Sequence, residues 1–329
     1  MRIPFDQLKA ELKRILLKLG LPEEKASLCA LAFAENSRDG VYTHGLNRFP
    51  KFVKSIKAGE INQDGIPILV KSLGAFEQWD GNFGPGVINA RFCMDRAIIL
   101  AERNGIGCVA LKNTNHWMRG GSYGWQAAEA GFIGICITNA TATTVPWGGT
   151  TSTLGNNPLV IAVPREEGHV VLDMAISQYS YGKVLHYKSL NEPLPFAGGY
   201  DNDGVLTTDS AAVAASIRLL PIGFWKGSGL SMMLDLLVSA LSEGRSVKHM
   251  TEEKTEAGVS QLFVAIKPGN TDQVEHIVNE IITFTKSSPP AKPDEPVLYP
   301  GENTLKTRAK SLEEGVLVDE KIWEEVKAL

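Results

Sequence analysis

The alternation of apolar and polar positions predicts an all-helical beginning. Residues 5–19 place apolar side chains at positions 5, 8, 12, 15, 16 and 19, which is the spacing of one face of an α-helix. Gly20 ends that helix, and Pro22 opens a second one. Pro50 marks the first turn of a third helix, because apolar positions recur at 49, 52, 53 and 56.

Beyond residue 66, short apolar runs alternate with helical patterns. A β-hairpin is expected over residues 67–80, with its turn near Gly74, and a long helix over residues 86–104. Further elements are expected at 107–111 (strand), 120–130 (helix), 132–138, 159–163 and 170–174 (strands), 228–241 (helix) and 261–266 (strand). Residues 287–296, rich in Pro, Ser and Lys, predict a surface loop or linker, and two short helices follow it. The pattern predicts an α/β core flanked by helices from both ends of the chain.

We therefore predict two parts. Residues 1–66 form a helical segment, which is joined by C-terminal helices within residues 296–329. Residues 67–295 form an α/β domain. The sequence contains no internal repeat and no low-complexity tract.

Composition and charge exclude several classes of protein. The chain has 329 residues, of which 43% are apolar and 21% charged, as in ordinary globular proteins. A formal charge of -4 with scattered Lys and Arg argues against nucleic acid or an anionic membrane as the main partner. No segment matches a membrane span or the core of a signal peptide. The widely spaced cysteines form no C-x-x-C pair, so we expect buried free thiols in a reducing cytoplasm: Cys29, Cys93, Cys108 and Cys136.

The first candidate for chemistry lies where a loop precedes the third helix. His44 and Arg48 are four residues apart beside a helix N-terminus, a position that attracts anions. A histidine titrates near neutral pH and can donate a proton, and arginine can hold a carboxylate with two hydrogen bonds. The pair therefore suits the reduction of a 2-oxo acid. Taken alone, the pair is better explained by an exposed helix arginine and a loop histidine bonded to backbone.

The usual dinucleotide signature is missing. No G-x-G-x-x-G sequence occurs, and the glycine run at 81–86 has the wrong order, so it predicts a turn before a helix. Four other segments have the small, polar or anion-binding residues that a cofactor or substrate site needs. They contain His116, Asp173, Trp225-Lys226 and Gly301-Glu302-Asn303. Each also has an ordinary structural explanation as a helix cap, a turn or a hydrogen-bonded histidine.

Metal binding is a further alternative. His44, His116 and Asp173 could meet in a metal-dependent hydrolase or lyase, but no H-x-x-H or H-E-x-x-H spacing supports this. We therefore predict no metal site. A non-catalytic binding protein is the third alternative.

Taken together, these segments resemble the malate/L-lactate dehydrogenase family, whose members bind a nicotinamide cofactor without a Rossmann fold. The resemblance runs from end to end, and within the family it is strongest to the enzymes that reduce diketo sugar acids. It rests on residues 40–45, 47–50, 115–129, 146–148, 157–158, 225–229 and 300–302. Thr43, Asn156 and His169 depart from the family pattern, which affects substrate preference and the choice between NADH and NADPH.

The resemblance implies an oxidoreductase that transfers a hydride from NADH, or alternatively NADPH, to a 2-oxo acid. Among such substrates, a diketo sugar acid is favoured over those of the malate, lactate or ureidoglycolate type. It also implies an α/β fold with a mixed sheet in the cofactor-binding domain, and a homodimer whose interface helps to form the site. His44 would be the proton donor, Arg48 the carboxylate clamp and His116 a second catalytic or orienting imidazole. The implied cofactor-binding residues are His169, Val170, Val171, Leu172, Asp173, Met174, Ala175, Trp225, Lys226, Gly301, Glu302 and Asn303.

Overall fold

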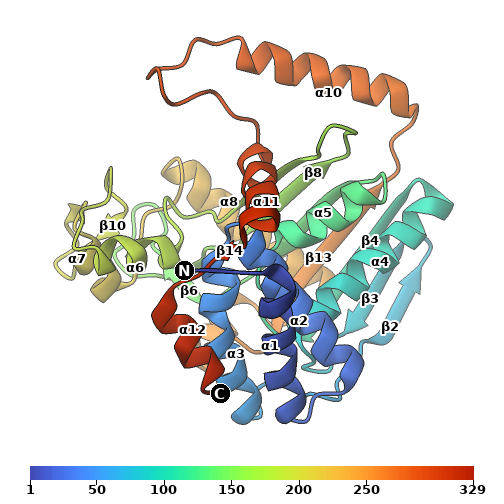
Figure 1. The fold of residues 1–329 in the computed structure, drawn as a ribbon, viewed down its shortest axis with the longest axis horizontal. Helices are drawn as coiled ribbons and strands as arrows, with labels where there is room; N and C mark the ends of the chain where they lie inside the picture. The colour runs from blue at the N-terminus through green and yellow to red at the C-terminus, as the bar shows by residue number, and fades with distance from the viewer.

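A seven-stranded mixed sheet forms the centre of the molecule. A computed structural model describes all of residues 1–329, and Figure 1 shows the sheet with helices on its faces. The strand order is β2 (Ile68–Leu73), β3 (Phe76–Asp80), β4 (Ile106–Thr114), β13 (Val259–Ile266), β5 (Ile133–Thr138), β8 (Leu159–Val163) and β9 (Val170–Met174). Only β3 and β4 run parallel; the other neighbours are antiparallel. The expected mixed α/β architecture is confirmed.

Helices cover both faces of this sheet because apolar residues continue on both sides of its strands. Val109 and Leu111 of β4 pack with α4 (Gly86–Asn104) and α5 (Gly121–Glu129). Ala110, between them, faces the other way and packs against α8 (Trp225–Ser242). Successive side chains of a strand point to opposite faces, so an unbroken apolar run requires a helix layer on each.

The first and last segments of the chain share one hydrophobic core. It joins α1 (Phe5–Lys18), α2 (Glu23–Arg38), α3 (Phe49–Lys57) and α12 (Glu320–Lys327). Strand β1 (Arg2–Ile3) pairs with β14 (Val316–Leu317), which follows α11 (Glu302–Glu314). Figure 1 shows these blue and red elements grouped at one side of the sheet. Whether residues 1–66 and 296–329 form a separate domain stays a prediction.

A second small sheet and several helices were not predicted. The sheet has the order β11 (Leu206–Thr207), β10 (Gly199–Tyr200), β12 (Arg218–Leu219), β6 (Ala142–Thr144) and β7 (Leu154–Gly155). The unpredicted helices are α6 (Tyr181–Ser189), α7 (Ser210–Ser216), α9 (Val247–Glu252) and α10 (Thr271–Lys286). Figure 1 shows α10 extending away from the body, and none of its residues is buried. No helix of the chain has both the length and the apolar character needed to cross a membrane.

Candidate functional site

His44 and Arg48 lie on two short 3₁₀ turns, Tyr42–His44 and Leu46–Arg48, that lead into α3. A loop before the helix was expected, and the turns give it a defined shape. Asn36 on α2 donates its side-chain amide to the carbonyl oxygen of His44 at 2.9 Å. Gly45 allows the close approach, because a Cβ there would collide with Ser37 on the same helix. Helix α2 therefore fixes the backbone of the histidine.

His116 follows β4 and lies against His44. The two imidazole rings are stacked, with centroids 5.7 Å apart and planes 14° apart. The Nδ1 atom of His116 accepts a hydrogen bond from the backbone N–H of Met118 at 3.0 Å. A neutral imidazole has one N–H, so this bond assigns the proton of neutral His116 to Nε2. The ring can therefore present an Nε2–H donor.

Burial and positive charge lower the pKa of both rings. The pKa of His44 falls to about 4, through burial and then through the charges of Arg48 and Arg119. The pKa of His116 falls to about 3, through burial and then through Arg48 and His44. The sequence-based expectation of a near-neutral pKa is therefore wrong for this state of the protein, in which both rings are neutral at pH 7.

Arg48 binds a carboxylate of the protein itself. Its Nη2 atom lies 2.5 Å from Oε2 of Glu256, and Lys51 donates to Oε1 of the same carboxylate at 2.9 Å. Although burial disfavours the charged form, the charge of Arg48, the electrostatic effect of His116 and the hydrogen bond from Lys51 lower the pKa of Glu256 to about 2. These four side chains line one cleft. An arginine that binds one carboxylate here can bind another.

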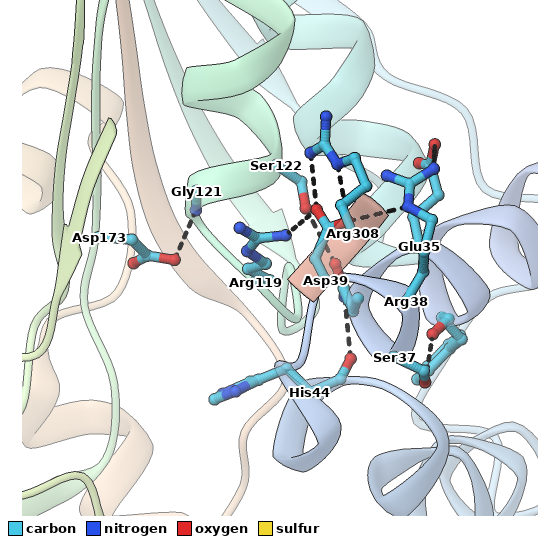
Figure 2. Close-up of polar contacts among 12 residues, drawn as sticks. Glu35, Ser37, Arg38, Asp39, His44, Arg119, Gly121, Ser122, Asp173 and Arg308 are labelled. Atoms are coloured by element: carbon cyan, nitrogen blue, oxygen red, sulfur yellow. Dashed lines mark hydrogen bonds and ion pairs between the residues drawn. The ribbon is translucent and has the colours of Figure 1, made fainter. Parts of the chain in front are cut away.

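A buried ionic cluster lies at the end of α2, the helix that holds the backbone of His44. Asp39 receives hydrogen bonds from Arg38, Arg119 and Arg308, at 2.8, 2.7 and 2.7 Å. The three arginines come from α2, the segment before α5, and α11. Figure 2 shows Arg119 between Asp39 and the contact of Asp173 with Gly121. The cluster therefore ties together three regions of the chain, and one of them, α2, also holds the backbone of His44.

The structure brings two of the expected cofactor segments together. The N–H of Val171 donates to the carbonyl oxygen of Pro300 at 2.9 Å, so residues 169–175, which contain β9, lie beside residues 301–303. Gly301 has φ +97°, and a Cβ on it would contact Val171 N at 3.1 Å and His169 O at 3.2 Å. Only glycine combines that conformation with that approach.

Two side chains of these segments have structural partners of their own. Asp173 accepts the backbone N–H of Gly121 at 2.7 Å and thereby caps the start of α5. Glu302 binds Lys286 and Lys306; although burial opposes its charge, these lysines lower its pKa to about 2. The side chain of Asn303 is exposed. Asn303, and the exposed Asp173 through its other oxygen, are therefore the residues of this group best able to contact a ligand.

A buried polar atom beside these segments has no partner in the protein. The ring of Trp125, on α5, lies 5.7 Å from that of His169 and is covered by Arg308 at 4.6 Å. Its Nε1 donor is buried and makes no hydrogen bond. A donor in such a place gains from a ligand that brings an acceptor. The residues present therefore fit a polar cofactor.

Trp225 and Lys226 stand apart from that pair of segments. They begin α8, three residues before the helix expected at 228–241, and the ring of Trp225 is exposed. Their connection to β9 runs through the backbone, since Ile222 donates to Ile176 at 2.9 Å just beyond the end of the strand. They lie near the cofactor segments without touching them.

The structure holds no group of three or more His, Cys, Asp or Glu side chains arranged to bind a metal ion. His44 and His116 meet, as the metal hypothesis required, but Asp173 is engaged with Gly121 instead.

Comparison with known proteins identifies the family. Residues 3–327 match the malate/L-lactate dehydrogenase family. The chain belongs to this family. A relative from Pasteurella multocida, named 2,3-diketo-L-gulonate reductase, is 45% identical, and the match covers 100% of both chains. A relative with the same name from Haemophilus influenzae is 44% identical, again over 100% of both.

Solved structures of the malate/L-lactate dehydrogenase family have the same fold. Malate dehydrogenase from Entamoeba histolytica is 26% identical with a TM-score of 0.95, and the match covers 100% of this chain and 96% of that one. Malate dehydrogenase from Pyrococcus horikoshii is 30% identical with a TM-score of 0.90, and the match covers 99% of this chain and 93% of that one.

The sequence did not reveal the side chains that contact the site but lie far from it along the chain. Glu256 is 208 positions from Arg48, and Arg308 is 269 positions from Asp39. Glu256 lies in a loop with no motif, so no local signal marks it. Asp39 was not singled out either, although its place beside Arg38 could have indicated an ion pair.

Proposed function

We propose that this protein transfers a hydride from NADH, or alternatively NADPH, to a 2-oxo acid and releases the 2-hydroxy acid. The preferred substrate is 2,3-diketo-L-gulonate or a related sugar acid, ahead of 2-oxo acids of the malate, lactate or ureidoglycolate type. The observation that carries the proposal is the facing pair of imidazoles beside an arginine that already holds a carboxylate. The full-length relatives named 2,3-diketo-L-gulonate reductase support the choice of substrate.

Arg48 orients the substrate. Its guanidinium has five N–H donors, and Glu256 occupies only Nη2, so further donors remain for the substrate carboxylate. Two parallel hydrogen bonds to that carboxylate would direct the neighbouring C2 carbonyl at the histidines. The nicotinamide cofactor, when bound, supplies the hydride that C2 accepts.

His44 donates the proton that the C2 oxygen gains, and His116 orients that oxygen. The Nε2–H of neutral His116 can hydrogen-bond to the carbonyl oxygen before the reaction. The charge of Arg48 is one of the causes that lower the pKa of His44. A substrate carboxylate on Arg48 offsets that charge, raises the pKa of His44 and so favours the imidazolium that acts as acid. Substrate binding thus prepares the proton donor.

The cofactor is held by residues 169–175, by Trp225 and Lys226, and by residues 301–303. The left-handed Gly301, the pairing of Val171 with residue 300 and the unpartnered Nε1 of Trp125 support this assignment. Lys226 makes no ion pair within the chain and begins a helix, where an anionic group of a dinucleotide is favoured.

We also propose that the protein is a cytoplasmic homodimer. The outer face of α8 exposes a row of apolar side chains that a soluble monomer rarely shows: Leu230, Met232, Met233, Leu236 and Leu237. This helix begins at Trp225 and Lys226, so a partner packed on it would lie beside the cofactor residues. All four cysteines are free thiols, which fits a reducing compartment.

A panel of 2-oxo acids tests the function. Purified protein is mixed with NADH or NADPH and each acid, 2,3-diketo-L-gulonate included, and the absorbance of the reduced cofactor is followed. We expect turnover with NADH, fastest with the sugar acid. Activity that is lost on chelation and restored by a divalent ion would instead support a hydrolase or lyase, and NADH binding without turnover would support a binding protein.

A further inference from the structure

The cleft beside the histidines contains balanced charge. Its cationic side chains are Arg48 and Lys51, and its anionic ones are Glu60 and Glu256. The fifth titratable group, His116, is neutral at pH 7 because of burial and the charge of Arg48. One substrate carboxylate on Arg48 therefore leaves the cleft with an excess of negative charge.

Glu256 also pairs with the second cation of the cleft, Lys51. One of its oxygens binds Arg48 and the other binds Lys51, so the charge of Glu256 offsets that of Lys51 and weakens its attraction for a second anionic group. The Glu256 side chain is 40% exposed and the Lys51 side chain 51% exposed. A ligand in the cleft can therefore reach both of them.

We propose that Glu256 restricts the substrates to 2-oxo acids with a single negative charge, whose tails are neutral and carry hydroxyl groups. This inference rests on the proposed function and narrows its substrate class. A second carboxylate or a sulfonate on the tail would face the carboxylates of Glu256 and Glu60, and the side chains that line the cleft include no unpaired cation. Hydroxyl groups can donate to the lone pairs that Arg48 and Lys51 leave free on Glu256. The selection thus acts partly by repulsion of the wrong substrate.

The test compares oxaloacetate with its 4-amide, 2-oxosuccinamate, which has nearly the same shape and one charge fewer. In the parent protein we expect kcat/KM to favour the amide. In Glu256→Gln, which removes the charge and releases Lys51, the ratio of oxaloacetate to amide should rise by about tenfold or more. Glu253→Gln is the matched control, because Glu253 lies in the same loop and pairs with Arg245, outside this cleft. Its ratio should not change.

Lys51→Gln gives a second, opposite test. It removes the cation and leaves the Glu256 charge, so the preference for the amide should widen. Thermal unfolding of each variant confirms that it is folded. In Glu256→Gln, an equal rise in kcat/KM for both substrates would mean that Glu256 merely competes for Arg48. An equal fall would mean that Glu256 only positions Arg48. Either result, or no change, overturns the proposal.

A binding measurement separates this inference from the proposed function. Succinate and succinamate cannot be reduced, and they differ by the same single charge. Ligand-observed NMR titration of the parent protein should show tighter binding of succinamate, and Glu256→Gln should reduce that difference. If no 2-oxo acid is turned over but this shift is found, the proposed function fails while the charge selection stands. If turnover is found without the shift, the charge selection fails alone.

Discussion

The imidazole rings of His44 and His116 lie face to face, with centroids 5.7 Å apart. They come from separate parts of the chain, a pair of 3₁₀ turns before α3 and the segment after β4. The backbone N–H of Met118 fixes the proton of neutral His116 on Nε2, while Asn36 holds the backbone of His44. Two stacked imidazoles with separate supports can take separate roles, one as proton donor and one as the group that orients the substrate.

Replacement of His44 tests the donor role. In His44→Asn we expect kcat to fall by about 10²–10⁴, since general acid catalysis contributes that much. Binding of NADH, followed by its fluorescence, should stay near normal. His186→Asn is the control, because His186 is exposed on α6. Equal loss of NADH binding and turnover in His44→Asn would argue for a structural role instead.

Two replacements of Arg48 separate its geometry from its charge. Arg48→Lys keeps the charge but loses the planar pair of donors, so KM should rise by about 10- to 100-fold with a smaller change in kcat. Arg48→Gln should raise KM as well. It should also move the pH at which reductive kcat/KM declines to a higher value, because the charge of Arg48 helps to lower the pKa of His44. Identical pH profiles in the two variants would contradict this link.

The histidine pKa values predict how stability depends on pH. The folded-state pKa of His116 is about 3, below its ordinary value of 6.5, so the unfolded chain binds more protons between these values. Stability should therefore fall as pH drops from about 6.5 toward 4. Carboxylates such as Asp39 and Glu256 have pKa values of about 2, so protonation of these groups lowers the stability further only below about pH 4.5.

Urea unfolding of His116→Gln between pH 7 and 4.5 checks this dependence. The variant should lose less stability over that range than the parent protein. His276→Gln, on the exposed face of α10, is the control and should follow the parent curve. A slope that stays the same in His116→Gln would show that its proton affinity does not differ between the folded and unfolded states.

Asp39 should be critical for stability. Asp39→Asn leaves three arginines around a buried site without their common anion, and it should lower the free energy of unfolding by about 3–5 kcal/mol. The exposed pair of Asp6 and Lys9 offers a control, for which Asp6→Asn should cost less than about 1 kcal/mol. Chemical denaturation measures both. Equal effects would mean that the cluster is hydrated and weak.

Gly301 tests the cofactor assignment. Gly301→Ala places a Cβ against β9 at φ +97°, and it should weaken NADH binding by at least about tenfold, since the cofactor segments must move apart. Gly131→Ala is a matched control: its φ is +84°, but the space around it is open. It should lose some stability and keep its NADH affinity, measured by fluorescence titration. Unchanged affinity in both would remove Gly301 from the site.

The main elements of the fold could be predicted because local signals mark them. The helix at 86–104 follows Pro85 and ends at left-handed Gly105, and the strands at 159–163 and 170–174 are apolar runs of about the length of one strand. The small sheet could not be predicted, because its two-residue strands, such as β10 and β11, carry no periodicity. Helix α10 did carry a signal, since Asn270 caps it and apolar residues recur along it, and it should have been recognised.

The candidate site was only partly within reach of the sequence. His44, Arg48 and His116 stand in distinctive segments, and the structure brings them together. Their environment was not predictable, because Glu256 and Arg119 reach them through the fold alone. The lowered pKa of each histidine follows from that environment and from burial, which no motif encodes.

The structure of a ternary complex with NADH and an unreactive 2-oxo acid analogue tests the central claim most directly. We expect a ring nitrogen of His44 within about 2.6–3.2 Å of the oxygen on C2. The nicotinamide C4 should face that carbon, and Arg48 should hold the carboxylate. A complex in which His44 lies remote from the nicotinamide ring and contacts no atom of the analogue would contradict the account.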